Sequence, residues 1–187
     1  MIIGVDEVGR GCWAGPVCVG AVVMHDSLEG IVDDSKKLSA GQRQIIAQLI
    51  KEKTVVSLGW ASPGYIDKHG LTAALTYASR RAIAGIAERA DEILLDGNSN
   101  YLGDPRVRTV VGGDGIEPAI AAASIVAKVA RDQYMAVIGE AKFAGYGFES
   151  HVGYGTPQHR AALALMGPSK IHRYRWAPLR RLLDVDN

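Results

Sequence analysis

Acidic side chains follow three aliphatic-rich, strand-like runs of this chain, at residues 1–5, 91–95 and 106–111. The acids that follow these runs are Asp6, Glu7, Asp96 and Asp114. In an open α/β sheet, ligands gather where strands end, so neighbouring runs would bring up to four carboxylates together. Any one of these acids could equally be a solvated cap or a turn former. Three such strand ends, each followed by a nearby glycine, favour a common site.

A cluster of carboxylates is costly by itself, because like charges repel and burial penalises ionisation. A divalent cation removes that cost, and hard oxygen ligands suit Mg²⁺ or Mn²⁺. Two such ions about 4 Å apart would contact the attacking and leaving oxygens of a phosphodiester. The acids therefore predict a metal-dependent site for phosphodiester chemistry.

Asp6 and Glu7 are consecutive, and consecutive strand residues face opposite sides of a sheet. Both can serve one site only if the strand ends or bulges at this point. Gly9 and Gly11 follow at once, and glycine tolerates the backbone of a turn or bulge. The sequence therefore predicts a break in the strand at the two acids.

The same opening stretch has a second interpretation as a dinucleotide-binding fingerprint, since Gly9, Gly11 and Ala14 match the spacing G-x-G-x-x-A. That motif requires a helix N-terminus to bind the pyrophosphate. Here Gly15-Pro16 leads instead into the β-branched run 17–24, which predicts a strand. The dinucleotide interpretation therefore fails.

The elements that must position the acids alternate between helix and strand after an initial strand pair. Strands are expected at 1–5, 17–24, 54–60, 91–95 and 106–111, the first two as a hairpin-like pair. Helices are expected at 39–53, after Ser62-Pro63, and at 71–90, 118–140 and 157–165. This order predicts an α/β domain with a mixed sheet.

The bulk composition fits one globular domain. Hydrophobic residues make up 48% and charged residues 22% of 187 residues, with a net charge of +1. No apolar run reaches membrane-spanning length and no secretory signal is visible, so a reducing cytoplasm is expected for Cys12 and Cys18. From residue 151 onward six Lys/Arg face two Asp/Glu. The basic and aromatic segment 170–181 suits either a phosphate backbone or a solvated terminal helix.

Short motifs follow one another along almost the whole chain. They are Asp6-Glu7-Val8-Gly9-Arg10-Gly11, Asp34-Ser35-Lys36-Lys37-Leu38, Asp96-Gly97-Asn98, Gly113-Asp114, residues 121–132, Tyr146-Gly147-Phe148, His151, Gly153-Tyr154-Gly155-Thr156, Gly167-Pro168 and His172-Arg173. In this order the chain resembles ribonuclease HII, the type 2 ribonuclease H family.

The resemblance implies an RNase H-like α/β fold with a mixed five-stranded sheet flanked by helices. It implies one catalytic domain over 1–187, in which about 145–187 form a C-terminal helical substrate-binding extension. The implied activity is endonucleolytic hydrolysis of RNA in RNA–DNA hybrids, and 5′ of single ribonucleotides in duplex DNA, leaving 3′-hydroxyl and 5′-phosphate ends. Such an activity belongs to ribonucleotide excision repair and DNA replication.

By the same resemblance, Asp6, Glu7, Asp96 and Asp114 are the catalytic carboxylates and hold two Mg²⁺ or Mn²⁺ ions. One ion would activate the attacking water and the other would stabilise the leaving 3′-oxygen.

Gly9-Arg10-Gly11 would read the ribose 2′-hydroxyl at the RNA–DNA junction. Glycines allow close approach to the sugar, and a guanidinium suits phosphate. Tyr154 would pack on the deoxyribose that follows; its alternative is a half-buried loop tyrosine.

Other candidates for substrate binding are Lys36, Lys37, Ser124 and Lys128. Ser124 and Lys128 are four residues apart, so one helix face could present both to phosphates. Their alternatives are a solvated lysine pair before a helix and, for Ser124, a small residue that permits close packing. His151 and His172 could bind phosphate or shape the extension, without the spacing of metal ligands.

Three positions depart from the family pattern. Gly112 and Val152 stand where lysines are usual, and Cys12-Trp13 replaces a Pro-aliphatic pair. Losing cations would weaken binding or change its salt dependence. Trp13 is either a nucleic-acid platform or a partly buried loop anchor.

RNA–DNA hybrid and ribonucleotide-containing duplex are the expected partners, bound by a monomer; a protein-binding tail and a membrane segment are not expected. Two other functions compete. A junction resolvase of the same fold would need no 2′-hydroxyl. A non-catalytic hybrid-binding module would be expected to lack a carboxylate, and all four are present.

Overall fold

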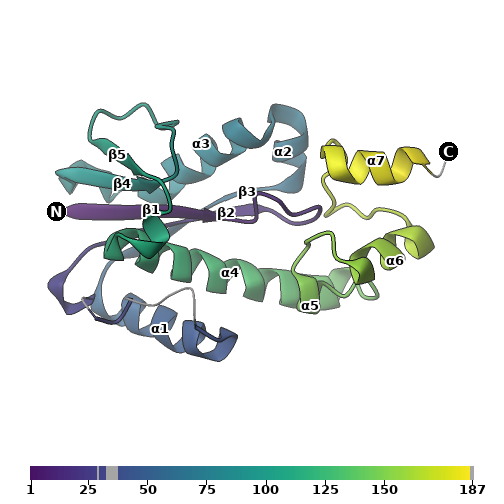
Figure 1. Cartoon of the computed structure of the whole chain (residues 1–187), viewed down its shortest axis with the longest axis horizontal. Coiled ribbons are helices and arrows are strands. Elements are labelled where there is room, and N and C mark those ends of the chain that lie inside the picture. The colour runs from purple at the N-terminus through teal and green to yellow at the C-terminus, as the bar shows by residue number, and fades with distance from the viewer. Residues whose placement is uncertain (29, 33–37, 186–187) are drawn as a thin grey trace.

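A computed structural model describes residues 1–28, 30–32 and 38–185. In this part of the chain a mixed five-stranded sheet lies between two layers of helices (Figure 1). Its strands run in the order β3-β2-β1-β4-β5; the β1–β2 and β2–β3 pairs are antiparallel, and β1–β4 and β4–β5 are parallel. The strands are β1 (Ile2–Val8), β2 (Val17–Val23), β3 (Val56–Ala61), β4 (Glu92–Asp96) and β5 (Val107–Val110). The predicted mixed sheet is confirmed.

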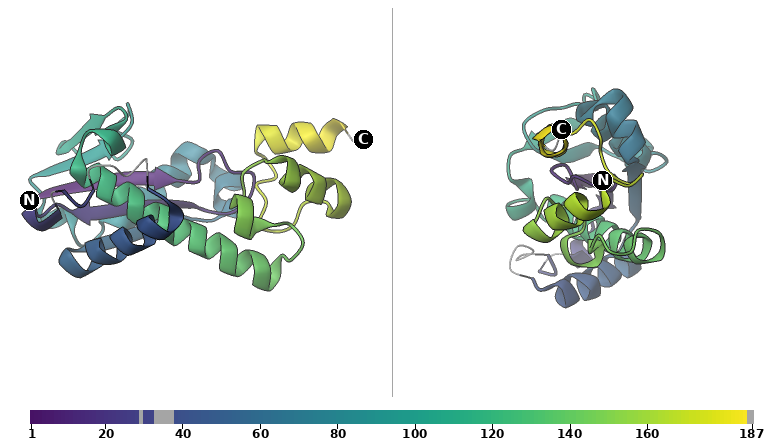
Figure 2. Two further views of the ribbon diagram at one scale, coloured as in Figure 1. Left: turned by 60° about the horizontal axis from the view of Figure 1, so that its bottom comes forward. Right: turned by 90° about the vertical axis from the view of Figure 1, so that its right-hand side faces the viewer.

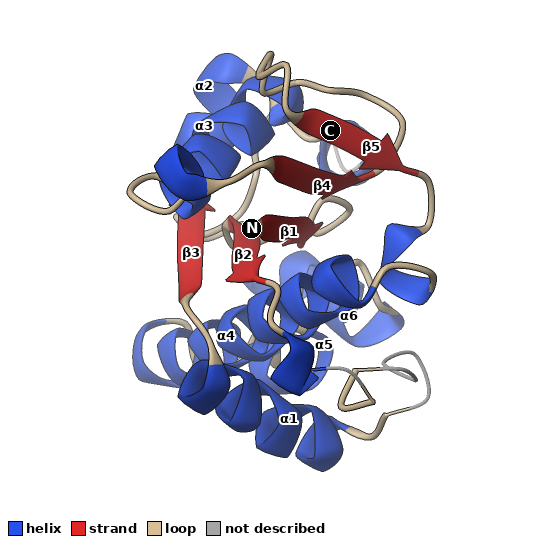
Figure 3. Ribbon diagram, turned by 90° about the vertical axis from the view of Figure 1, so that its left-hand side faces the viewer, coloured by secondary structure: helices blue, strands red, loops and turns tan. Residues whose placement is uncertain are grey.

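The helices cover both faces of the sheet. α2 and α3 lie on one face, and α1 and α4 lie on the other (Figure 3). The α-helices are α1 (Ala40–Lys53), α2 (Pro63–His69), α3 (Leu71–Ile83), α4 (Pro118–Lys142), α5 (Phe148–His151), α6 (Pro157–Met166) and α7 (Ala177–Val185). Short 3-10 turns are η1 (Asp26–Leu28), η3 (Ala87–Arg89) and η4 (Gly113–Gly115). None of the helices in these described ranges is both long and apolar enough to cross a membrane.

Helix starts agree with the sequence prediction, because the capping residues are local signals. Ser39 accepts from the backbone N–H of Gln42, whose side chain bonds back to Ser39 in a capping box. Ser62 caps α2, and Pro63 occupies its first turn. The helix predicted to reach residue 90 instead ends at Ile83. Gly85, with φ of +81°, turns the chain out of the helix.

β1 is longer than predicted, and this changes how the two acids at its end are presented. Asp6 pairs with Gly20, Glu7 with Val19 and Val8 with Cys18 in regular antiparallel register. The expected break or bulge at the acids is therefore wrong. Pairing with β2 keeps the strand extended until Gly9, which adopts φ of +91°.

Glycines in the sheet let α4 pack close to its strands. A Cβ on Gly4 would lie 2.0 Å from the Ala119 carbonyl oxygen, and one on Gly20 would lie 2.4 Å from that of Ala123. Distances this short are incompatible with any larger residue unless the helix moves. The N-terminal half of α4, which carries Ser124, is thereby fixed against β1 and β2.

α4 continues past the sheet into a third apolar cluster, separate from the two that cover the sheet faces. Its C-terminal half packs with the α5–α7 region. In the left view of Figure 2 this region lies at the end of the molecule away from the N-terminus. Met135 of α4, Trp13 of the β1–β2 loop and Phe148 of α5 are among its buried members. The β1–β2 loop is thus packed against the C-terminal segment.

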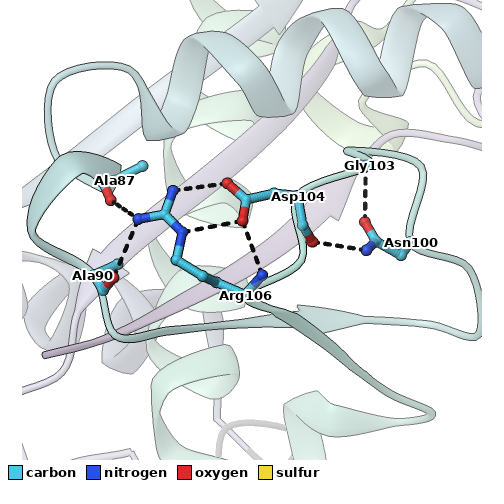
Figure 4. A network of polar contacts seen from close by, with 6 residues as sticks. All are labelled: Ala87, Ala90, Asn100, Gly103, Asp104 and Arg106. Carbon is cyan, nitrogen blue, oxygen red and sulfur yellow. Dashed lines mark hydrogen bonds and ion pairs between the residues drawn. The ribbon is translucent and has the colours of Figure 1, made fainter.

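The loop between β4 and β5 is held by one arginine. The Arg106 guanidinium forms an ion pair with Asp104, 2.7 Å between Nη2 and Oδ2 (Figure 4). Its Nη1 donates to the carbonyl oxygens of Ala87, at 2.6 Å, and Ala90, at 3.2 Å. Asn100 donates to the Asp104 carbonyl at 3.0 Å. These bonds tie the loop to the segment before β4, which fixes the two strands that lead to Asp96 and Asp114.

Candidate active site

Asp6 is a buried carboxylate in the last part of β1, with only 6% of its surface exposed. Burial raises its pKa to about 7; a hydrogen bond from Ser124 opposes this rise, and the charges of Glu7 and Asp96 add to it. The structure therefore brings Asp6 together with Ser124 of α4 and with two other acids. Near neutral pH a large fraction of this carboxyl group is therefore protonated unless a cation is supplied.

Glu7 follows Asp6 in the extended strand, so its side chain leaves the opposite face of the sheet. The charge of Asp96 nevertheless acts on both carboxyl groups, so the two acids share one electrostatic environment without the strand break that the sequence argument required. Its Oε1 accepts a hydrogen bond from Nη1 of Arg10 at 2.7 Å. Burial raises the pKa of Glu7, the Arg10 contact lowers it, and the charge of Asp96 raises it further. Its Oε2 is buried without a hydrogen-bond partner in the described part of the chain. A buried carboxylate oxygen of this kind calls for a donor or a cation.

Asp96 ends β4 and connects the site to the turn that carries Asp114. Its Oδ1 accepts a hydrogen bond from the Gly113 backbone N–H at 2.7 Å. Asp114 follows Gly113 in the sequence. It is partly buried and lines a small cavity of about 60 Å³ beside Pro118 of α4. The fourth acid is thus placed next to the end of β4, as the strand-end argument predicted.

The chemistry of these side chains fits a divalent cation. All four offer hard carboxylate oxygens, Glu7 has an unpaired buried oxygen, and burial, with a smaller contribution from neighbouring carboxylates, raises the pKa of Asp6 and Glu7. As they stand, the residues in the described ranges include no group of three or more acids, histidines or cysteines poised to hold one ion. Binding an ion between several of them therefore requires side-chain rotation.

The Gly9–Pro16 loop, which contains Gly9-Arg10-Gly11, is held by two fully buried arginines that sequence reasoning did not assign to the site. Arg173 has no exposed surface and donates to three carbonyl oxygens of this loop. They belong to Gly9 at 2.6 Å, Arg10 at 2.8 Å and Gly15 at 2.9 Å. The guanidinium thus supplies hydrogen-bond donors to carbonyl groups that lie in the loop outside the sheet.

Arg131 of α4 is the second buried arginine. It donates to the carbonyl oxygens of Pro16 at 2.8 Å, Ala14 at 3.1 Å and Val152 at 2.9 Å. A Cβ on Gly9 would lie 2.2 Å from its Nε, so glycine is required there for packing as well as for its φ of +91°. The sequence held one signal that could have identified Arg131 as a buried residue. Arg131 lies four residues after Ala127, so it falls on the apolar side of the helix.

Tyr154 lies close to the Gly9–Pro16 loop, with 40% of its surface exposed. The Gly153 carbonyl, one residue before it, accepts from the backbone N–H groups of Trp13 at 2.8 Å and Ala14 at 3.2 Å. Trp13 is only 8% exposed and belongs to the apolar cluster of the C-terminal region. Trp13 is therefore a buried loop anchor and not an open stacking platform.

The two candidates on α4 have different surroundings. Ser124 contacts Asp6, whereas Lys128 forms an ion pair with Asp132, 2.9 Å between Nζ and Oδ1. Lys128 also lines a cavity of about 450 Å³ that is bounded by Arg43 and Glu149. Lys36 and Lys37, the other predicted substrate contacts, lie outside the described residues.

His151 and His172 shape the C-terminal region, together with a third histidine, His159. All three side chains are buried. His151 contacts the Tyr146 carbonyl at 2.8 Å, and its ring stacks on His159 with centroids 4.5 Å apart. His159 and His172 join through their Nε2 atoms at 2.9 Å. Of the two predicted roles, the structure supports the shaping one.

Comparison with known families finds one matching family model, "Ribonuclease HII", over residues 3–179. A ribonuclease HII from Streptomyces avermitilis is 48% identical over 183 residues, covering 96% of this chain and 78% of that protein. One from Halorhodospira halophila is 47% identical over 187 residues, covering 97% of this chain and 94% of that protein.

Solved structures share the arrangement of sheet and helices. The chain is similar to ribonuclease HII in a PCNA:RNase HII complex from Archaeoglobus fulgidus, with a TM-score of 0.80, 28% identity, and 97% and 96% of the two chains covered. Ribonuclease H2 from Pyrococcus horikoshii gives a TM-score of 0.81 at 23% identity, covering 98% and 97%. These similarities confirm the predicted RNase H-like fold.

Proposed function

The chain belongs to the ribonuclease HII family, a family of metal-dependent endoribonucleases that act on RNA–DNA hybrids, and from this premise we propose a more specific activity. The enzyme hydrolyses the RNA strand of hybrids and also cuts 5′ of single ribonucleotides embedded in duplex DNA. Cleavage leaves a 3′-hydroxyl and a 5′-phosphate. The observation that carries this proposal is the shared electrostatic environment of Asp6, Glu7 and Asp96, together with the bond from the Gly113 backbone N–H to Asp96, which ties the turn carrying Asp114 to this site.

Asp6, Glu7, Asp96 and Asp114 are the residues that would hold two Mg²⁺ or Mn²⁺ ions. When bound, the ions would supply a water of lowered pKa and stabilise the leaving 3′-oxygen. The side chains contribute ionised oxygens whose repulsion is relieved by the cations. Ser124 orients Asp6 through its hydroxyl, and Arg10 occupies one oxygen of Glu7 while leaving the other buried and unpaired.

Junction recognition is assigned to Gly9-Arg10-Gly11 and Tyr154. Arg10 is exposed, and the position of Gly11 is open, with no atom within 4 Å of a Cβ built on it. A sugar can therefore approach the backbone at Gly11, where the 2′-hydroxyl distinguishes RNA from DNA. The exposed part of the Tyr154 ring offers an apolar surface to the following deoxyribose. Because Tyr154 lies within 145–187, this segment supplies part of the substrate-binding surface.

Asp114→Asn tests the proposed role of the carboxylates. The variant should bind hybrid with nearly normal affinity but cleave it at least about 100-fold more slowly in Mg²⁺, the scale on which one electrostatic stabiliser contributes. Asp26→Asn, which changes an exposed acid in the η1 turn, provides the control and should keep its cleavage rate. A normal rate for Asp114→Asn would remove Asp114 from the proposed site.

A further inference from the structure

Two adjacent buried residues connect the two loops that carry the proposed junction contacts. His172 is 1% exposed and Arg173 is fully buried. They lie in the segment between α6 and α7, far in sequence from the Gly9–Pro16 loop and from Tyr154. The Arg173 side chain donates to the Gly9–Pro16 loop, and the His172 side chain contacts His159, which in turn contacts the Tyr154 carbonyl.

Arg173 fixes the Gly9–Pro16 loop through a fork of three bonds. Its Nη2 and Nη1 donate to the carbonyl oxygens of Gly9 and Arg10, and its Nε donates to that of Gly15. Both ends of the loop are thus held by a single planar group. Burial lowers the pKa of Arg173 to about 10, so its side chain remains charged at neutral pH. A lysine carries a similar charge but lacks this rigid fork of donors.

His172 reaches the Tyr154 loop through His159. The Ser169 backbone N–H donates to Nδ1 of His172 at 2.9 Å. The Ser169 carbonyl oxygen lies 3.2 Å from the same nitrogen but already accepts the His172 backbone N–H at 2.9 Å, so we assign the His172 proton to Nε2. At the other end, Nδ1 of His159 must donate to the Tyr154 carbonyl at 2.9 Å, which leaves its Nε2 as an acceptor. The partners of the two Nδ1 atoms therefore give the central bond a single direction, from His172 Nε2–H to His159 Nε2. These two nitrogens are 2.9 Å apart.

Backbone bonds join the same three segments. The Arg173 N–H donates to the Trp13 carbonyl at 2.8 Å, and the Gly15 N–H donates to the Ile171 carbonyl at 2.8 Å. The Gly153 carbonyl accepts from Trp13 and Ala14 on the other side of the loop. The loop, the segment before Tyr154 and the His172 segment consequently form one connected unit.

We propose that His172 and Arg173 are positioning residues that set the Gly9-Arg10-Gly11 backbone and Tyr154 relative to each other for ribonucleotide recognition. This inference rests on the proposed function, because it takes these two elements as the junction contacts. Neither residue acts on the reacting phosphate. Without them, the Gly9-Arg10-Gly11 backbone and Tyr154 are no longer correctly placed relative to each other, while the carboxylates keep their positions. The effect on KM and on the preference between substrates should therefore be larger than the effect on kcat.

The kinetic test uses Arg173→Lys, which keeps the charge and removes the fork. For a duplex with one ribonucleotide, KM should rise by up to about 100-fold, the scale of loss that a misplacement of about 1 Å can cause. The kcat should change much less, and long hybrids should be affected less than the single-ribonucleotide duplex. Arg175→Lys is the matched control, because Arg175 is exposed on the same segment. An unchanged KM and an unchanged substrate preference in Arg173→Lys would overturn the proposal.

A spectroscopic test on the protein without substrate separates this inference from the proposed function. Nitrogen-15 NMR of the imidazole rings at pH 7 should show His172 protonated on Nε2 and His159 on Nδ1, both neutral. His172→Gln should shift the amide signal of Tyr154, and Arg173→Lys should shift that of Gly11. Opposite tautomers, or amide signals that do not move, would overturn the positioning role. If wild-type protein fails to cut the single-ribonucleotide duplex, the proposed function fails, while these signals still decide whether the two residues position the loops.

Discussion

Asp6 destabilises the folded protein when it is ionised, because it is buried beside other carboxylates. Its pKa is raised to about 7, chiefly by burial, so between pH 4 and pH 7 the folded state binds more protons than the unfolded state. The free energy of unfolding consequently falls as pH rises through this window, and the full cost applies above pH 7. A residue retained at such a cost is expected to serve function and not stability.

Asp6→Asn should therefore stabilise the protein in the presence of chelator. The gain in unfolding free energy should grow by about 2 kcal/mol between pH 5 and pH 8, because the variant has no charge to bury. Urea unfolding at the two pH values measures it. Asp26→Asn, which changes an exposed acid, serves as the control. A gain that is equal at both pH values would show that Asp6 is not a strained carboxylate.

Among the helices, α4 supports the site at two points, since it presents Ser124 to Asp6 and Arg131 to the Gly9–Pro16 loop. Its position depends on the absence of a side chain at Gly4, where a Cβ would lie 2.0 Å from the Ala119 carbonyl oxygen. The packing of this helix on β1 thus determines both the environment of the carboxylate and the shape of the loop.

Gly4→Ala should displace α4 and destabilise the protein by about 1–3 kcal/mol, the usual range for overpacking a core. The displacement should also lower cleavage activity at temperatures where the variant is still folded, because Ser124 moves away from Asp6. Gly41→Ala, at an open position near the start of α1, is the control and should not lose stability. Equal stability of the two variants would contradict the role given to Gly4.

Elements that depend on local sequence signals could be predicted, whereas features that depend on contacts between distant residues could not. Ser39 and Ser62 mark the starts of their helices because both residues cap the first turn. The acids at strand ends were predicted from the order of strands and helices along the chain. The continuation of β1 through Glu7 depends on pairing with β2, which a local pattern of charged residues does not reveal. The buried Arg173 was unpredictable for a similar reason, since its carbonyl partners lie far away in sequence.

At the scale of the whole molecule, the buried histidines join the C-terminal region to the loops beside the sheet. Burial lowers the pKa of His159 and of His172 to about 4. The unfolded state therefore binds more protons than the folded state between about pH 4 and pH 6.5, and acidification through this window lowers the free energy of unfolding. This dependence has the opposite sign to that of Asp6.

Replacing one of these histidines should weaken the acid sensitivity. Between pH 6.5 and pH 4 each histidine contributes a slope of up to about 1.4 kcal/mol per pH unit, and His159→Gln should remove one such contribution. Denaturant unfolding across this range measures the slope. His25→Gln, at an exposed site, should leave it unchanged. If the slopes of wild type and His159→Gln are parallel, the buried neutral histidines are not the cause.

Cleavage of an end-labelled DNA duplex with a single ribonucleotide tests the central claim most directly. The duplex is incubated with Mg²⁺, Mn²⁺ or chelator beside an all-DNA duplex of the same sequence, and the cut is mapped to the nucleotide. The account predicts a metal-dependent nick immediately 5′ of the ribonucleotide and none in the control. Cleavage of the all-DNA duplex, or cleavage of long hybrids without any nick at the single ribonucleotide, would contradict it.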